Sequence, residues 1–143
     1  MLTLPSYATL INQRLVIPSN KKPFLAIDSH FIQKLLEPWV RRIRFDEAGY
    51  IGAYPDVQTA IEDGQIADAR THFCQFGYFE HRRPYSILVD EDWYLAQYAD
   101  VREAVNSKLF TTGQAHFDSV GYREGRIPWP GFELAMDSGK SLV

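Results

Sequence analysis

Residues 72–84 read HFCQFGYFEHRRP, and residues 116–128 return to that pattern as HFDSVGYREGRIP. At the same interval of 44 residues, positions 45–84 align with 89–128 without a gap, and 14 of the 40 positions are identical. Average residue usage would give roughly two or three identities. Self-similarity at a fixed period is the signature of a tandem repeat. The sequence therefore predicts one structural unit that is used twice.

Each copy is expected to begin with two short helices. Asp46 and Asp90 stand directly before apolar residues at helical spacing, and a carboxylate there accepts from the free N–H groups of the first turn. Asp56 and Asp100 hold the same kind of place before a second apolar stripe, so we expect them to cap the second helix. Gly64 can end that helix in the first copy.

A third helix in each copy is expected to have one apolar face and to end at a glycine. In the first copy that face carries Ile66, Ala69, Phe73 and Phe76. Gly77 and Gly121 follow where a helix commonly takes a left-handed residue. The predicted fold class is all-α: two tandem copies of a three-helix, 44-residue repeat with an N-terminal capping helix and an extended N-terminal arm.

The segments before the repeat have different patterns. Residues 1–27 contain three prolines and no helical period, which predicts an extended arm. This arm either packs along its own domain or reaches onto a partner. Residues 28–44 predict a helix that begins at Asp28 or Ser29 and is kinked or restarted at Pro38. Because the end units of repeat proteins are usually atypical, we expect this helix to cap the open face of the first copy.

The predicted domain organisation follows from these assignments. Residues 28–128 form a single helical domain, in which the capping helix is followed by the first repeat at 45–88 and the second at 89–128. Residues 129–143 form an apolar tail that becomes polar toward its end.

Residues that often carry chemistry have structural explanations here. His72 and His116 each precede an equivalent phenylalanine, with no second ligand at the spacing that a metal site needs. We expect each to be half-buried, with a ring nitrogen bonded to a backbone carbonyl or a nearby Asp. A glycosidase-like pairing of Asp56 with Asp100 is less favoured than helix capping. Cys74 is the only cysteine, which excludes an internal disulfide. The sequence predicts no catalytic, cofactor-binding or metal-binding residue.

The tail of each copy is the candidate interaction edge. An Arg beside a Tyr is a common contact pair at protein interfaces. The alternative is a connector whose charged groups are satisfied within the repeat. The candidate residues are Tyr78, Glu80, Arg82, Tyr122, Glu124 and Arg126.

The pattern F/V-D-x-x-x-Y-I/L-x-x-Y-x-D-V-x-x-A, followed by H-F-x-x-x-G-Y-x-E-x-R-x-P, resembles a repeat found beside bacterial glycosyltransferase and polysaccharide-biosynthesis domains. The resemblance covers residues 45–128. The second copy matches best, whereas the first has His81 where the family has Gly. This resemblance implies an accessory helical module without catalytic residues, and it implies a link to bacterial glycan synthesis.

Charge and hydropathy limit the classes of partner. A net charge of −3 gives no general attraction to nucleic acid. No stretch approaches the roughly 18 apolar residues of a membrane span, and no signal peptide opens the chain. We expect a soluble, cytoplasmic, non-catalytic accessory or scaffold protein that binds a partner protein through its repeats and arm. The alternatives are a carbohydrate-binding module of polysaccharide synthesis, with Trp93, Trp129 and the tyrosines as stacking surfaces, and a small enzyme of unknown class.

Overall fold

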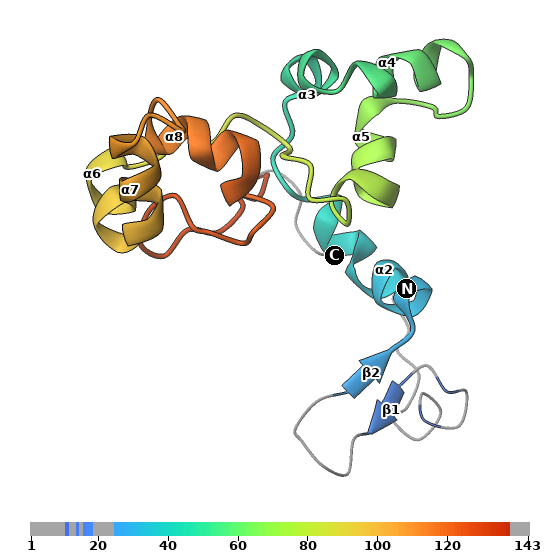
Figure 1. The fold of residues 1–143 in the computed structure, drawn as a ribbon. Coiled ribbons are helices and arrows are strands. Elements are labelled where there is room, and N and C mark those ends of the chain that lie inside the picture. The colour runs from blue at the N-terminus through green and yellow to red at the C-terminus, as the bar shows by residue number, and fades with distance from the viewer. Residues whose placement is uncertain (1–10, 12–13, 15, 19–24, 138–143) are drawn as a thin grey trace. The chain divides into compact units, whose positions relative to one another are not determined.

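The computed structural model describes residues 11, 14, 16–18 and 25–137 of the chain. The chain divides into two compact units, Met1–Val40 and Arg41–Val143 (Figure 1). The boundary falls inside residues 28–44, which the sequence assigned to the helical domain. The capping of the first copy by that segment stays a prediction.

The first unit contains a short antiparallel sheet. Strand β1 (Val16–Pro18) pairs with β2 (Leu25–Ile27), with Val16 opposite Ile27. This pairing differs from the single extended arm expected over 1–27, because runs of three residues carry no alternation that would reveal a strand partner. Most of the rest of that arm lies outside the described residues.

Helix α2 (Ser29–Val40) follows the sheet. The Asp28 carboxylate accepts from the Phe31 N–H at 2.9 Å, which confirms Asp28 as the residue that begins the helix. Pro38 lies inside α2, and the helix continues through it to its end rather than restarting.

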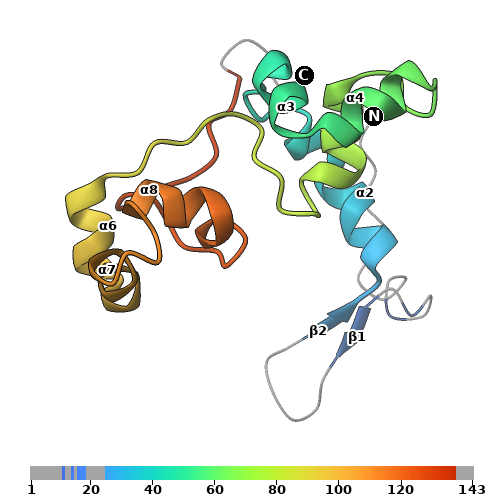
Figure 2. The ribbon, with the colours of Figure 1, turned by 45° about the horizontal axis from the view of Figure 1, so that its top comes forward.

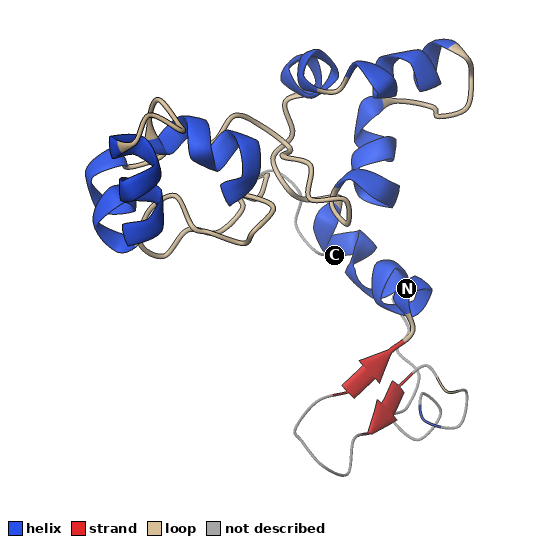
Figure 3. Ribbon diagram, in the orientation of Figure 1, coloured by secondary structure: helices blue, strands red, loops and turns tan. Residues whose placement is uncertain are grey.

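The second unit is mostly helical, as the sequence predicts (Figure 3). Its first half contains α3 (Glu47–Ala53), α4 (Pro55–Glu62) and α5 (Ala69–His72), and α5 runs on into a π-helical turn, η1 (Phe73–Gly77). Its second half contains α6 (Glu91–Gln97), α7 (Ala99–Asn106) and α8 (Gly113–His116), followed by the π-helical turn η2 (Phe117–Gly121). Helices α6 and α7 lie against each other (Figure 2).

The caps of the first helices are as predicted. Asp46 accepts from the Gly49 N–H at 3.0 Å, and Asp90 accepts from the Trp93 N–H at 3.1 Å. These bonds satisfy donors that a helix start leaves without an intrahelical partner.

The predicted caps of the second helices are wrong. Helix α4 begins at Pro55, so Asp56 lies within its first turn instead of before it. Proline is favoured at this first position because its missing N–H would have no helical partner there. Helix α7 begins one residue before Asp100 in the same way. The freed carboxylates have another partner, described below.

A set of aromatic and aliphatic side chains fills each half of the second unit. In the first half Tyr50, Val57 and Phe73 are almost fully buried, and Tyr94, Val101 and Phe117 hold the equivalent places in the second. Phe76, expected on the apolar face, is 45% exposed. It lies in η1, whose wider turn moves side chains off the i, i+3, i+4 face of an α-helix.

Gly77 and Gly121 do not have the left-handed conformation predicted for them. A Cβ on Gly77 would overlap the hydroxyl of Tyr50, and a Cβ on Gly121 would overlap that of Tyr94. These glycines are therefore needed because a tyrosine hydroxyl approaches the backbone closely.

Five other residues of this unit take left-handed conformations, and all but Gly131 form matched pairs. Gly64 (φ 69°) and Lys108 (φ 61°) follow the second helix of each half, so Gly64 ends its helix as predicted. His81 (φ 60°) and Gly125 (φ 74°) stand in the tails. Each half thus has one glycine and one residue with a side chain at these two positions.

The segment after residue 128 returns to the start of the unit, which the sequence did not predict. Phe132 and Leu134 pack against the core of the second half. Farther on, the Arg44 N–H donates to the Ala135 carbonyl and the Asp137 N–H donates to the Arg42 carbonyl, both at 2.7 Å. Residues 132–137 are therefore held against the core of the second half and against residues 42–44.

Among the described residues, no helix is long and apolar enough to span a bilayer.

Candidate functional site

The two arginines of the candidate edge are held by acidic groups of their own half. Arg82 donates two hydrogen bonds to Asp56, at 2.9 and 2.8 Å, and a third to Glu80 at 2.8 Å. Its guanidinium also lies over the ring of Tyr54, 4.9 Å from the centroid. Such two-pronged bonds between guanidinium and carboxylate fix direction as well as charge. They match the alternative of a connector satisfied within the repeat.

Arg126 makes the same set of contacts in the second half. It binds Asp100 through two nitrogens, at 2.9 and 2.5 Å, and Glu124 at 2.8 Å, and it lies 4.8 Å from the ring centroid of Tyr98. The hydrogen bonds from Arg126 lower the pKa of Asp100 to about 2. The Arg82 hydrogen bonds also lower the pKa of Asp56. Both carboxylates are therefore charged at neutral pH.

Only part of the candidate edge comes together in space. Glu80, Arg82 and Tyr122 line one hollow between the two halves, and Tyr78 lines a neighbouring hollow that also includes Tyr122. Neither hollow includes Glu124 or Arg126. Four of the six candidate residues, Tyr78, Glu80, Arg82 and Tyr122, therefore border the junction, whereas Glu124 and Arg126 do not.

The hollow at the junction has a volume of about 490 Å³, within the usual range of ligand pockets. Most of its lining is polar or charged. The lining residues are Ala53, Tyr54, Glu80, His81, Arg82, Arg83, Asp118, Ser119, Tyr122 and Arg123.

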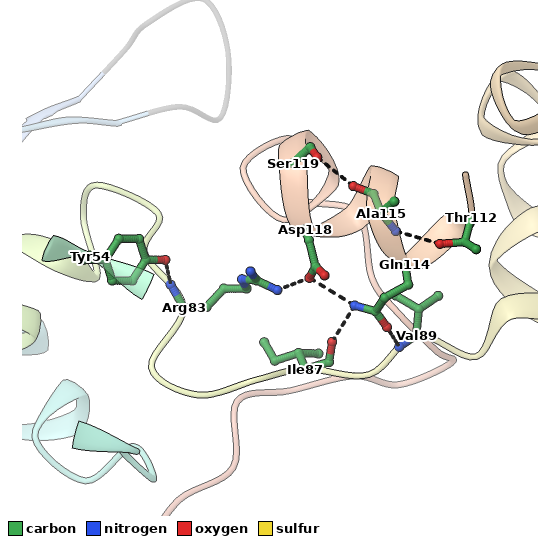
Figure 4. Close-up of polar contacts among 9 residues, drawn as sticks. All are labelled: Tyr54, Arg83, Ile87, Val89, Thr112, Gln114, Ala115, Asp118 and Ser119. Carbon is green, nitrogen blue, oxygen red and sulfur yellow. Dashed lines mark hydrogen bonds and ion pairs between the residues drawn. The ribbon is translucent and has the colours of Figure 1, made fainter. Parts of the chain in front are cut away.

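An ion pair between Arg83 and Asp118 crosses this hollow and joins the two halves (Figure 4). The backbone N–H of Arg83 donates to the Tyr54 hydroxyl at 2.9 Å, which holds the arginine against the first half. Asp118 also accepts from the Gln114 side chain at 3.0 Å, and that side chain donates in turn to the Ile87 carbonyl at 3.0 Å. The two halves are thus linked by a chain of polar contacts.

Two groups in the hollow are open to a ligand. Among the residues that the structure describes, the Arg123 side chain makes no hydrogen bond or ion pair, and the Tyr122 hydroxyl makes no hydrogen bond. Burial raises the pKa of Tyr122 to about 12, so its hydroxyl is protonated at neutral pH. The hollow therefore offers a guanidinium and a phenol as hydrogen-bond donors.

Two smaller hollows adjoin the first and extend it into a groove. One, of about 380 Å³, shares His81 and Tyr122 with it and is otherwise lined by Tyr78, Phe79, Phe132 and Leu134. The other, of about 210 Å³, shares Ala53, Tyr54, Arg83 and Asp118 with it. We name the three together the junction groove. It is apolar at the Phe79 end and charged in the middle.

The recurring histidines are buried. The Tyr50 hydroxyl lies 3.1 Å from His72 Nδ1, and the Tyr94 hydroxyl lies 3.1 Å from His116 Nδ1. Burial, and then the charge of Arg82 or Arg126, lowers the pKa of each histidine. Burial is deeper than expected, and the hydrogen-bond partner is a tyrosine rather than the predicted carbonyl or Asp. In the described ranges, no three or more His, Cys, Asp or Glu side chains are grouped to hold a metal ion.

Sequence reasoning missed the central residues of the groove. Arg83 and Asp118 do not recur, since their counterparts are Ile127 and Cys74, so a search for repeated residues passes over them. The pairing of Asp56 with Arg82 left a signal, because both residues recur and are 26 apart in each copy.

No protein-family model, no curated protein and no solved structure matches the chain. The resemblance to the repeats beside glycosyltransferase domains therefore stays a prediction.

Proposed function

We propose that this chain is a non-catalytic accessory or scaffold protein that binds a partner protein at the junction groove between two tandem repeats. The observation that supports this proposal most directly is a difference between the arginines that recur in both copies and the charged residues that do not. Arg82 and Arg126 recur, and each binds a carboxylate of its own half. Arg83, Asp118 and Arg123 do not recur, and all three line the groove.

The tandem repeat itself is supported by contacts that recur at an interval of 44 residues. The first-helix cap, the Tyr–His contact and the Arg–Asp pair recur with similar distances. The Asp46 N–H donates to the Pro84 carbonyl at 2.9 Å, and the Asp90 N–H donates to the Pro128 carbonyl at 3.0 Å. In each half this bond joins the first residues of the repeat to its last residue, as expected when one structural repeat is used twice.

The N-terminal arm is a second proposed contact region, as the sequence suggested. The exposed side chain of Ile17 in β1 is 54% accessible, so this strand has apolar surface to offer a partner. Two contact regions on one chain would strengthen binding to a single partner through their combined effect.

Site-specific photo-cross-linking in the native cell tests the proposal. Ser119, exposed at the groove, would be replaced by a photoreactive phenylalanine derivative, and Glu103, exposed on α7 and outside the groove lining, would carry it in the control. At native expression levels we expect one protein to cross-link stoichiometrically from position 119 and not from position 103. A protein that copurifies with no partner and gives no specific cross-link would contradict the proposal.

A glycan-binding role in polysaccharide synthesis is the alternative. It is favoured by Trp129, a residue that is 37% exposed and therefore accessible in part for stacking on a sugar. The other predicted platform, Trp93, is partly buried against the second core. Calorimetric titration with neutral and acidic polysaccharides separates the two functions, and heat of binding that is lost in Trp129→Ala would support the alternative.

A further inference from the structure

The charges in the middle of the junction groove are unevenly used. Arg82 is paired with Asp56 and Glu80, and Arg83 is paired with Asp118. Among the described residues this leaves Arg123 as the guanidinium in the groove that no carboxylate neutralises. A guanidinium at the edge of a pocket binds a carboxylate strongly, because charge-assisted bonds are about twice as strong as neutral ones. The unpaired charge therefore favours a ligand with an acidic group.

The Tyr122 hydroxyl adds a second donor beside that charge. It comes from the residue directly before Arg123 and lines both the charged hollow and the apolar hollow. A neutral phenol donates to a carboxylate oxygen without adding a competing negative charge. The carboxylate site is thus placed next to the boundary with the apolar end.

The apolar end sets the chemistry of the adjoining group. The side chains of Phe79, Phe132 and Leu134 line it together with Tyr78 and Tyr122. A hollow of about 380 Å³ is large enough for an aliphatic or aromatic side chain. A ligand that fills both parts must present an apolar group beside an acidic one.

The aromatic rings of the groove are poorly placed for a sugar. Arg82 lies over the Tyr54 ring, and the Tyr50 ring lies 4.7 Å from it. Tyr122 meets the Phe117 ring edge-on at 5.9 Å and packs against the core of the second half. Sugar binding by stacking needs an open aromatic face, and these rings are already in contact with other groups.

We propose that the junction groove binds an extended peptide segment of the partner protein in which an acidic residue adjoins an apolar one. Arg123 and the Tyr122 hydroxyl hold the carboxylate, and the hollow at Phe79 and Leu134 takes the apolar side chain. Alternating pockets for successive side chains are a common way to read an extended peptide. This inference rests on the proposed function and specifies the chemistry of the partner.

Fluorescence anisotropy with defined peptides tests it on the full chain. The probes are labelled, end-blocked hexapeptides with Phe-Glu or Glu-Phe flanked by glycines, and matched peptides with Gln in place of Glu. We expect at least one Glu peptide to bind about tenfold more tightly than its Gln partner, since one charge-assisted contact is lost. Raising the salt concentration should reduce this difference.

Two variants locate the carboxylate. Arg123→Gln should weaken the Glu peptide about tenfold and leave the Gln peptide unchanged, which is the signature of a direct pair in a double-mutant cycle. Arg102→Gln, which removes an exposed arginine of α7 outside the groove, is the matched control and should change neither. Asp118→Asn should tighten binding of the Glu peptide severalfold, because it frees Arg83 for the ligand.

Several results would overturn the inference. Equal binding of Glu and Gln peptides, no effect of Arg123→Gln, or no binding of any peptide at millimolar concentration would each do so. Tighter binding of oligogalacturonate than of the Glu peptides would assign the groove to an acidic sugar instead. If a native partner cross-links at position 119 and Arg123→Gln leaves that cross-link intact, the peptide chemistry fails and the proposed function stands. If peptides bind but the native cell yields no partner, the proposed function fails instead.

Discussion

The two halves of Arg41–Val143 are held together internally by the same side chains, whereas the ion pair that joins one half to the other uses side chains that differ between them. Asp46 and Asp90 cap equivalent helices, and Tyr50 and Tyr94 contact equivalent histidines. At the junction, Arg83 of the first half binds Asp118 of the second. Residues that hold each half together therefore recur, whereas the two residues of the ion pair between the halves do not.

Identity alone does not guarantee an equivalent contact. Glu91 accepts from the backbone N–H groups of Gly113 and Gln114, at 2.5 and 3.1 Å. Its counterpart Glu47 makes no such bond among the described residues. The start of α8 is thus held to α6 in a way that α5 is not held to α3.

The largest predicted effect concerns the glycines that meet a tyrosine hydroxyl. Gly77→Ala and Gly121→Ala should each lower the free energy of unfolding by about 1–3 kcal/mol, because the added methyl group overlaps Tyr50 or Tyr94 in a filled core. Urea denaturation measures both. Gly52→Ala is the control: no atom lies within 4 Å of its added Cβ, so the gain in helix propensity should stabilise by about 0.5–1 kcal/mol. A Gly77→Ala protein as stable as the Gly52→Ala protein would refute the steric explanation.

The Tyr–His contacts should be of similar value in the two halves. Tyr50→Phe and Tyr94→Phe each remove one buried hydrogen bond and leave the ring in place, so each should cost about 1 kcal/mol. Thermal or urea unfolding of the two variants gives the comparison directly. A cost in one half and none in the other would show that the equivalent geometry hides different energetics.

Stability should also depend on pH through the same histidines. Burial lowers the pKa of His72 and His116 below the usual 6.5, so the unfolded chain takes up protons before the folded one does. The free energy of unfolding should therefore be level above about pH 6.5 and fall as the pH decreases from there toward the lowered values. A double variant, His72→Gln with His116→Gln, should lose this slope, and an unchanged slope would assign it to other groups.

How much of this could be predicted from the sequence depends on the distance over which each interaction acts. The Asp46 and Asp90 caps were predicted because a cap and its helix are adjacent in sequence. The Asp56–Arg82 pair and the return of the tail to Arg42 were not, since local patterns do not show which distant segments meet. The groove was missed for the same reason: its central residues come from both halves and do not recur.

The left-handed positions predict a smaller effect. At each of the two positions one half has glycine and the other half does not, so the substitution that stabilises one half is the reverse of the one that destabilises the other. His81→Gly in the first half and Lys108→Gly in the second should each stabilise by about 0.5–1 kcal/mol, because glycine adopts a positive φ without steric cost. The reverse changes, Gly125→Ala and Gly64→Ala, should destabilise by about 1 kcal/mol. Denaturation of all four variants checks the signs, and a destabilising His81→Gly would mean that the imidazole makes a contact of greater value.

The smallest predicted effect on stability concerns the arginine clusters of the two halves. Arg82→Gln and Arg126→Gln should each cost only about 0.2–1 kcal/mol, because the partner carboxylates Asp56 and Asp100 are 62% and 65% exposed and water screens the pairs. The cost should shrink in high salt and should be the same in both halves, since the contacts match within a few tenths of an ångström. Arg82 also borders the junction groove, whereas Arg126 does not. An equal loss of stability combined with weaker peptide binding in Arg82→Gln alone would therefore show that one of two equivalent residues has acquired a second role through its position.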